Sequence, residues 1–93
     1  MSVNLEQLRR EDCRFSVRAY LAGRPSIAQT ADTICRRMRK FGDGDFTETE
    51  VEDALSFLST LTPPQAVSVR EAIGSTLYWR ITAAGTLAHE RGE

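Results

Sequence analysis

Hydrophobic positions recur at intervals of three or four residues along most of the first two thirds of the chain, and this spacing predicts helices. The first predicted helix covers residues 4–22. One of its faces carries Cys13, Ser16, Val17, Tyr20 and Leu21, and Leu5 and Leu8 are expected to extend that face toward its start. Gly23 and Pro25 end the helix, because glycine suits a C-terminal cap and proline restricts the residue before it.

The second predicted helix begins at Ser26. Ser26 and Gln29 have the S-x-x-Q spacing of a capping box, in which each side chain bonds a free backbone N–H at the start of a helix. Apolar residues then follow at helical spacing, namely Ile27, Ala31, Ile34, Cys35 and Met38. The last turn carries four cations on the other side, Arg36, Arg37, Arg39 and Lys40, where positive charge complements the negative end of the helix dipole.

The third predicted helix has the clearest boundaries. Thr47 and Glu50 form a second capping box, and Phe46 and Val51 have the spacing of a hydrophobic staple. From Glu48 to about residue 61 the helix is expected to bury Val51, Ala54, Leu55, Leu58 and Leu61. The loop before it, residues 42–45, is a turn rich in glycine and aspartate, and Pro63 and Pro64 stop the helix.

The hydrophobic period then changes to two, which predicts a hairpin. Val67 and Val69 alternate with Ser68 and Arg70, and Leu77, Trp79 and Ile81 alternate with Tyr78, Arg80 and Thr82. The loop over residues 71–75 places Gly74 where a positive φ is needed. Two strands alone are marginal in water, so the apolar side of the hairpin must pack on the helices. Trp79 suits either that core or an exposed interface.

A fourth, short helix is predicted after the hairpin. Thr82 caps it, its apolar residues are Ala83, Ala84, Leu87 and Ala88, and it ends near Gly92. The predicted fold class is therefore mainly α with a small antiparallel hairpin (α+β). Three helices form the core, and a two-stranded hairpin and a short C-terminal helix complete one domain over residues 1–93.

The composition of the chain indicates a globular protein and argues against several other classes of protein. The chain has 93 residues, of which 41% are hydrophobic, as in globular proteins. The longest apolar runs are too short to cross a bilayer, and charges at residues 6–12 rule out a secretory signal, so a cytoplasmic protein is expected. Cys13 and Cys35 are expected to be buried thiols, and with His89 they lack the spacing of a metal site.

The segment Tyr78-Trp79-Arg80-Ile81-Thr82-Ala83-Ala84-Gly85 resembles the end of a wing strand running into a threonine-capped helix. With the order of elements, the chain resembles a winged helix-turn-helix domain over nearly all its length, and it resembles small prophage-encoded members of that fold. The resemblance implies that residues 47–61 are the recognition helix. It also implies DNA contacts from Thr47, Thr49, Glu52, Asp53 and Ser56, with wing contacts from Arg70, Ser75, Thr76 and Arg80.

The third helix departs from the DNA-binding pattern. It contains no lysine or arginine, and it carries Glu48, Glu50, Glu52 and Asp53 in its first two turns. Contacts of lysine and arginine with phosphates supply most non-specific DNA affinity, so acids presented to DNA oppose binding. The alternative interpretation is that these acids favour the positive end of the helix dipole.

Charge is unevenly distributed along the chain. Residues 1–41 carry nine basic and four acidic residues, a net charge of +5, and residues 42–93 carry three basic and nine acidic residues, a net charge of −6. The candidate nucleic-acid contacts are accordingly Arg36, Arg37, Arg39 and Lys40, extended by Arg70 and Arg80 from the hairpin. The alternative is that the four cations of the second helix form only a solvated helix end.

The sequence favours a binding protein over an enzyme. A nucleophile with a matching base is not evident, and the glycine-rich turn carries two acids where a phosphate would lie. Two functions remain open, neither with a cofactor. One is a DNA-associated regulatory or phage accessory protein that binds double-stranded DNA weakly through its basic residues. The other is a protein-interaction module that uses the acidic third helix, including Glu48, and the hairpin aromatic Tyr78. The opposite charges of the two halves would also permit a homodimer.

Overall fold

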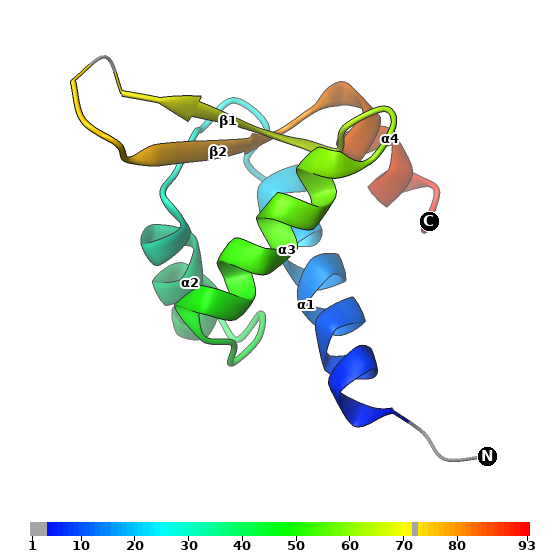
Figure 1. Ribbon diagram of the computed structural model, residues 1–93. Coiled ribbons are helices and arrows are strands. Elements are labelled where there is room, and N and C mark those ends of the chain that lie inside the picture. Colours follow the sequence, from blue (N-terminus) through cyan, green and yellow to red (C-terminus); the bar gives the residue numbers. More distant parts are fainter. Residues whose placement is uncertain (1–3, 72) are drawn as a thin grey trace.

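The computed structural model describes residues 4–71 and 73–93 (Figure 1). The expectations for the first three residues and for Ala72 in the hairpin loop lie outside this part. In chain order the elements are α1 (Leu5–Ala22), α2 (Ala31–Lys40), α3 (Glu48–Thr60), β1 (Ala66–Arg70), β2 (Leu77–Ile81) and α4 (Ala83–Glu90). The predicted fold class is confirmed, because a helical core carries one antiparallel hairpin and a short final helix.

One hydrophobic core joins the three long helices to the hairpin. Its largest fully buried side chains come in pairs from the helices, Val17 and Leu21 from α1, Ile34 and Met38 from α2, and Val51 and Leu55 from α3. Trp79 and Ile81 of β2 belong to the same core. Each such side chain contributes about 1.5–3 kcal/mol by leaving water. None of the described helices is long and apolar enough to span a bilayer.

The local structure at the start of α3 is as predicted. The hydroxyl of Thr47 accepts from the backbone N–H of Glu50, and the Glu50 carboxylate accepts from the backbone N–H of Thr47. Phe46 and Val51 are both buried, and Leu61 is partly buried against the core. Gly74 in the hairpin loop has a φ of +119°, which confirms the need for glycine there.

The predicted start of the second helix is wrong. Helix α2 begins at Ala31 and is capped by Thr30, whose hydroxyl accepts from the N–H of Thr33. Gln29 does not cap a helix, because its backbone N–H and carbonyl both pair with Trp79 of β2, at 2.9 and 2.7 Å. That pairing holds the segment before α2 extended, and Ile27 consequently lies outside the core with 51% of its surface exposed.

The prediction that Val67 and Val69 form the side of β1 that packs on the helices is also wrong. In the observed register Ala66 pairs with Ile81 and Ser68 pairs with Trp79, and residues directly opposite in an antiparallel pair share a face. Ala66 therefore faces the core, and Val69, on the other face, is 52% exposed. The small side chains of Ala66 and Ser68 stand beside the large ones of β2.

The expectation that Leu5 and Leu8 extend the apolar face of the first helix into the core is likewise wrong. The first turns of α1 project beyond the other helices (Figure 1) and leave these side chains 75% and 45% exposed. In α4, Leu87 is 44% exposed, whereas Ala88 and Gly85 are buried. Helix α4 therefore contacts the core through its smallest residues. A Cβ atom on Gly85 would lie 2.2 Å from the carbonyl oxygen of Gln65.

Candidate functional site

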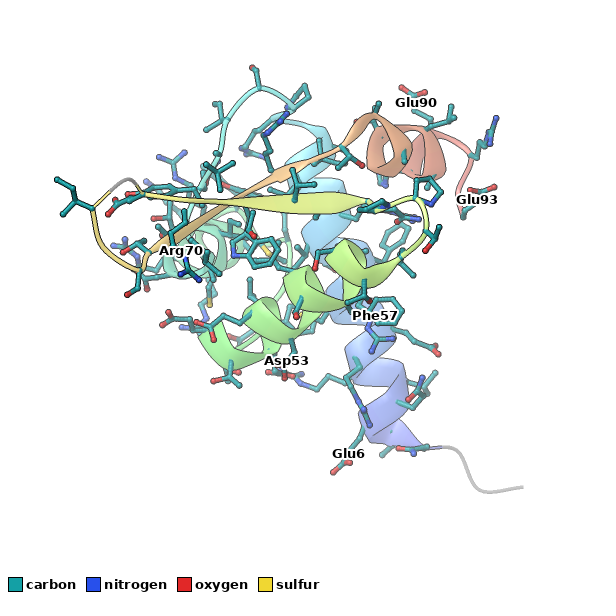
Figure 2. All side chains as sticks on the ribbon, turned by 45° about the horizontal axis from the view of Figure 1, so that its top comes forward. Glu6, Asp53, Phe57, Arg70, Glu90 and Glu93 are labelled. Carbon is teal, nitrogen blue, oxygen red and sulfur yellow. The ribbon has the colours of Figure 1, made fainter. Side chains whose placement is uncertain are left out.

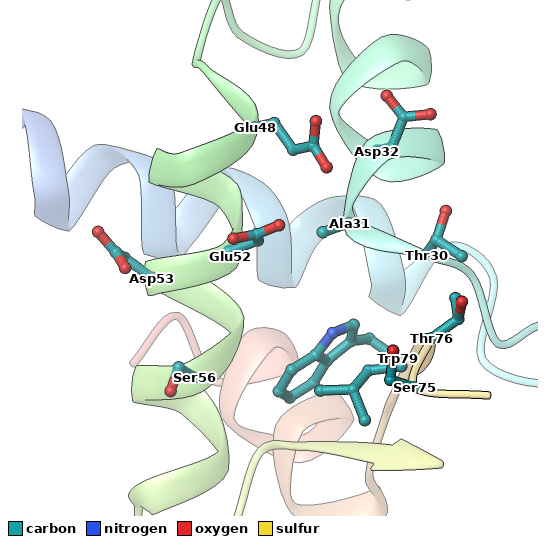
Figure 3. Close-up of a pocket in the computed structure, with 11 residues that line it drawn as sticks. Thr30, Ala31, Asp32, Glu48, Glu52, Asp53, Ser56, Ser75, Thr76 and Trp79 are labelled. Atoms are coloured by element: carbon teal, nitrogen blue, oxygen red, sulfur yellow. The ribbon is translucent and has the colours of Figure 1, made fainter. Parts of the chain in front are cut away.

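An open groove of about 660 Å³ lies between the start of α2, the outer face of α3 and the hairpin (Figure 3). Its walls come from three separate parts of the chain. Thr30, Ala31 and Asp32 line it from α2, Glu48, Glu52, Asp53 and Ser56 from α3, and Ser75, Thr76, Leu77 and Trp79 from the hairpin. A groove of this size can hold a few residues of an extended chain.

The packing of α3 determines which of its residues face the groove. Val51 and Leu55 are fully buried, which fixes the rotation of the helix about its axis. Glu48, Glu52 and Ser56 follow one another at intervals of four residues, so they share a face, and they line the groove with Asp53. Asp32 faces them from α2 (Figure 3).

The groove is strongly acidic. Four carboxylates line it, from Asp32, Glu48, Glu52 and Asp53, and none of its described lining residues is a lysine, arginine or histidine. The only ion pair of the four is between Asp32 and Arg36, at 3.1 Å, among the residues that the structure describes. Like charges on facing walls create a negative potential that attracts cations.

Trp79 forms the floor of the groove and belongs to the core as well. The side chain is 9% exposed, and it lines the groove beneath the carboxylates. Within the described residues its indole N–H donates no hydrogen bond, and Figure 3 shows the indole nitrogen turned toward the side on which Glu52 lies. Of the two roles left open for Trp79 by the sequence, the structure confirms packing in the core, and the exposed edge of the side chain lines the groove.

Among the residues that the structure describes, no three histidine, cysteine, aspartate or glutamate side chains are arranged to hold a metal ion.

The four predicted cations at the end of α2 differ in their surroundings. Arg36 pairs with Asp32, and Arg39 pairs with Asp45 at 3.3 Å and donates to the backbone carbonyl of Phe46 at 2.9 Å. Arg37 and Lys40 are exposed and make no ion pair within the described residues. Two of these four cations, Arg36 and Arg39, are thus already paired with acids of the same chain.

The two predicted arginines of the hairpin do not lie together. Arg70 pairs with Leu77 on the face that carries Trp79, whereas Arg80 pairs with Val67 on the opposite face. Since directly paired residues share a face, the two guanidinium groups leave the hairpin on opposite sides. The structure therefore does not unite the six predicted cations in one surface.

Tyr78, a predicted partner contact, lies on the outer face of the hairpin. It is half-buried, and its hydroxyl donates to the carboxylate of Glu71, an interaction that raises the pKa of Tyr78. Glu48 lines the groove and Tyr78 does not. Glu48 and Tyr78, the two predicted partner contacts, thus belong to different surfaces.

The other predicted contacts of α3 are divided as well. The Thr47 hydroxyl is engaged in the helix cap, and Thr49 is exposed but does not line the groove. Ser56, Ser75 and Thr76 do line it. The sequence did not indicate Asp32, because its place in the groove depends on where α2 begins.

Glu50, the remaining acid of α3, has a structural role. Arg9 of α1 donates to both of its carboxylate oxygens, with its Nη2 atom 2.9 Å from Oε1, while the capping box holds the same carboxylate. The hydrogen bond from Arg9 and that from the backbone of Thr47 lower the pKa of Glu50 to about 2. This carboxylate is thus committed to holding α1 and α3 together.

No known protein family matches the chain, and neither a curated protein nor a solved structure is significantly similar to it.

Proposed function

We propose that this chain is a non-catalytic winged-helix module that holds a basic segment of a partner protein in the groove between α2, α3 and the hairpin. The observation that carries this proposal is the lining of the groove, with four carboxylates and no cationic side chain. In DNA-binding members of the winged-helix fold, the third helix enters the major groove. Here the same helix carries the acids, which suit a cationic partner.

The chemistry of the groove fits arginine and lysine side chains. An exposed pair of opposite charges contributes about 0.2–1 kcal/mol, and a cation on the face of a tryptophan contributes about 0.5–1 kcal/mol. Three or four such contacts together suit a weak, reversible interaction. The indole N–H of Trp79 adds a donor for a main-chain carbonyl of the bound segment.

DNA association through the basic residues is the second function predicted from the sequence, and it has less support. Arg36 and Arg39 are engaged with acids of the chain, and Arg70 and Arg80 leave opposite faces of the hairpin. Phosphates approaching α3 would meet four carboxylates. Any DNA binding is therefore expected to be weak and to fall steeply as salt rises.

An NMR titration separates the two functions. The isotope-labelled protein is titrated with a short peptide rich in arginine and glycine, and separately with a random DNA duplex, each at low and at moderate salt. We expect the peptide to shift the backbone amide signals of Glu52, Asp53, Thr76 and Trp79, and DNA to leave them in place. Shifts at Arg37 and Lys40 with DNA, together with no response to the peptide, would refute the proposal.

Charge-removal variants make the test specific. The double variant Glu52→Gln with Asp53→Asn removes two groove charges that have no partner within the described chain, and we expect it to bind the peptide about tenfold more weakly. Glu90→Gln is the matched control, because Glu90 is exposed on α4 and does not line the groove. Equal binding by the double variant and the wild type would contradict the assignment of the groove.

A further inference from the structure

The edge of β2 that faces the start of α2 has a backbone partner at only one residue of the described chain. The N–H and the carbonyl of Trp79 both bond to Gln29, and this pair is an isolated bridge. In an antiparallel ladder the next such pair would join Ala31 to Leu77, two residues further along each strand. Ala31 is instead the first residue of α2, and no backbone hydrogen bond joins it to Leu77. The ladder therefore stops after one step.

Leu77 presents its main chain at the place where the ladder stops. Backbone groups of successive strand residues point to opposite edges, so those of Leu77 point to the same edge as those of Trp79. Thr76, the residue before Leu77, faces the other edge, where its carbonyl accepts from the N–H of Glu71 at 3.3 Å. Leu77 and Ala31 both line the acidic groove. The N–H and the carbonyl of Leu77 thus form an open edge position, to which an extended chain can pair.

The packing of α2 keeps this edge position open. Thr30 caps the helix, so the chain turns away from β2 directly after Gln29. Ile34 and Met38 of the same helix are fully buried in the core. Ala31 could pair with Leu77 only if the first turn of α2 unwound, which would cost the cap. The gap beside Leu77 is therefore a stable feature of the fold.

The register of the hairpin determines which side chains of a paired segment would meet the acids. Residues that pair directly in an antiparallel sheet share a face. A residue paired with Leu77 would therefore point its side chain to the face that carries Trp79, and its two neighbours would point to the outer face. Glu52 and Asp53 line the groove together with Trp79 (Figure 3). Every second residue of a paired segment is thus directed toward carboxylates.

Trp79 offers a second unfilled position beside Leu77. Its side chain is only 9% exposed, and its indole N–H donates no hydrogen bond to any described residue. The nitrogen is turned toward the side of the groove on which Glu52 lies (Figure 3). A largely buried donor without an acceptor is unfavourable, and a carbonyl of a bound segment would supply the acceptor.

Arg70 lies close enough to Leu77 that its charge must be considered. It pairs with Leu77 across the hairpin, so it lies on the β1 side and away from the open edge (Figure 2). A segment on the other side of Leu77 would be two strand spacings from Arg70, or about 10 Å. This distance is about one Debye length at 0.1 M salt, so Arg70 repels a bound cation only weakly.

We infer that the basic partner segment binds as an extended strand that pairs with Leu77 and carries arginine or lysine at every second residue. This inference rests on the function proposed for the groove and adds the way in which the segment is recognised. One basic residue exchanges both main-chain hydrogen bonds with Leu77, and its side chain points toward Glu52 and Asp53. The segment takes the place that Ala31 would occupy if the strand before α2 continued.

Peptides methylated on alternate main-chain nitrogens test this pairing. The parent probe is an acetylated and amidated heptapeptide of alternating glycine and arginine. In one analogue each arginine carries a methyl group on its main-chain nitrogen, and in the matched control each glycine does. Only the arginine nitrogens face β2 in the proposed pairing. We therefore expect the first analogue to bind about tenfold more weakly than the parent, and the control to bind within about twofold of it.

Hydrogen exchange of the Leu77 N–H, followed by NMR, tests the same bond from the side of the protein. In the free protein this N–H should exchange faster than that of Tyr78, which faces β1. A saturating amount of the parent peptide should slow the exchange of Leu77 at least about fivefold. Glu90 on α4 does not line the groove (Figure 2), and the exchange of its N–H should not change.

Two variants of Leu77 separate its main chain from its side chain. Leu77→Pro removes the N–H, and Leu77 is the first residue of β2, a position that tolerates proline. Leu77→Ala keeps the N–H and is the matched control. We expect Leu77→Pro to bind the parent peptide about fivefold more weakly than Leu77→Ala does. If Leu77→Pro does not fold, the two methylated peptides decide.

The outcomes distinguish this inference from the function on which it rests. Suppose that the parent peptide binds and that Glu52→Gln with Asp53→Asn weakens it. Equal binding of the two methylated peptides, or unchanged exchange of Leu77, would then show that the strand pairing is wrong, while the proposed function of the groove stands. If the parent peptide does not bind at all, both are wrong.

Discussion

Replacement of Glu50 by glutamine should destabilise the protein at neutral pH and have almost no effect near pH 2. Glu50 accepts hydrogen bonds from Arg9, which lies 41 residues earlier in the sequence, and from the backbone of Thr47. Glutamine can still accept the bond from Thr47, because glutamine also occupies this position in capping boxes. The substitution therefore removes the charge and leaves the cap.

The magnitude follows from the pKa of Glu50. The bonds from Arg9 and Thr47 lower that pKa from 4.5 to about 2, and each unit of pKa difference corresponds to about 1.4 kcal/mol. The Glu50 side chain is 28% exposed and that of Arg9 is 51% exposed, so water and salt screen the pair. We therefore expect Glu50→Gln to lower the free energy of unfolding at neutral pH by only about 1 kcal/mol.

The sign of the pH dependence is fixed by the direction of the shift. A carboxylate with a lowered pKa in the folded state binds fewer protons there than in the unfolded state between the two pKa values. Its stabilisation is complete above about pH 4.5 and is lost as the pH falls toward 2. The gap in stability between the wild type and Glu50→Gln should close over the same range.

Urea unfolding at several pH values between 2 and 7 measures this gap. Glu50→Ala should lose up to about 1 kcal/mol more than Glu50→Gln, because alanine also removes the acceptor of the hydrogen bond from the Thr47 N–H. Glu90→Gln, on the exposed side of α4, is the control and should follow the wild type at every pH. A gap between wild type and Glu50→Gln that is constant from pH 7 to pH 2 would refute the ion pair with Arg9 as its cause.

Two further predictions concern the core. Gly85→Ala should lower the free energy of unfolding by about 1–3 kcal/mol, because a Cβ atom there would lie 2.2 Å from the Gln65 carbonyl oxygen and 2.7 Å from Ile81; an unchanged melting temperature would contradict this close approach. Burial raises the pKa of Cys13 to about 12, so iodoacetamide at pH 8 should alkylate it far more slowly in the folded protein than in urea, as measured by mass spectrometry. Equal rates in the two states would show that the thiol is accessible.

The sequence predicts α3 well because the interactions that define this helix are local. Its capping box, its staple and its apolar face all lie within residues 46–61, and proline follows it. The start of α2 was predicted wrongly for the opposite reason. Two capping patterns compete there, one at Ser26 and one at Thr30, and the choice is made by Trp79, which lies 50 residues beyond Gln29 in the sequence.

The candidate site was predictable only in part, for the same reason. The acids of α3 and the apolar face that fixes their direction can be read from the sequence. The inclusion of Asp32 depends on the start of α2, and the separation of Tyr78 from Glu48 depends on the register of the hairpin. Both are set by contacts between distant residues, which hydrophobic periodicity does not encode.

Folding accounts for some of the acids of α3 and not for others. Glu50 caps the helix and binds Arg9, and Glu48, in the first turn, favours the positive end of the helix dipole. Glu52 and Asp53 lie beyond that turn, and within the described chain neither makes an ion pair or a side-chain hydrogen bond. They face a groove that already holds two other carboxylates, so their mutual repulsion opposes folding. Natural chains depart from the local rules of folding chiefly at functional sites. Glu52 and Asp53 are therefore the residues on which recognition of a basic partner should depend most.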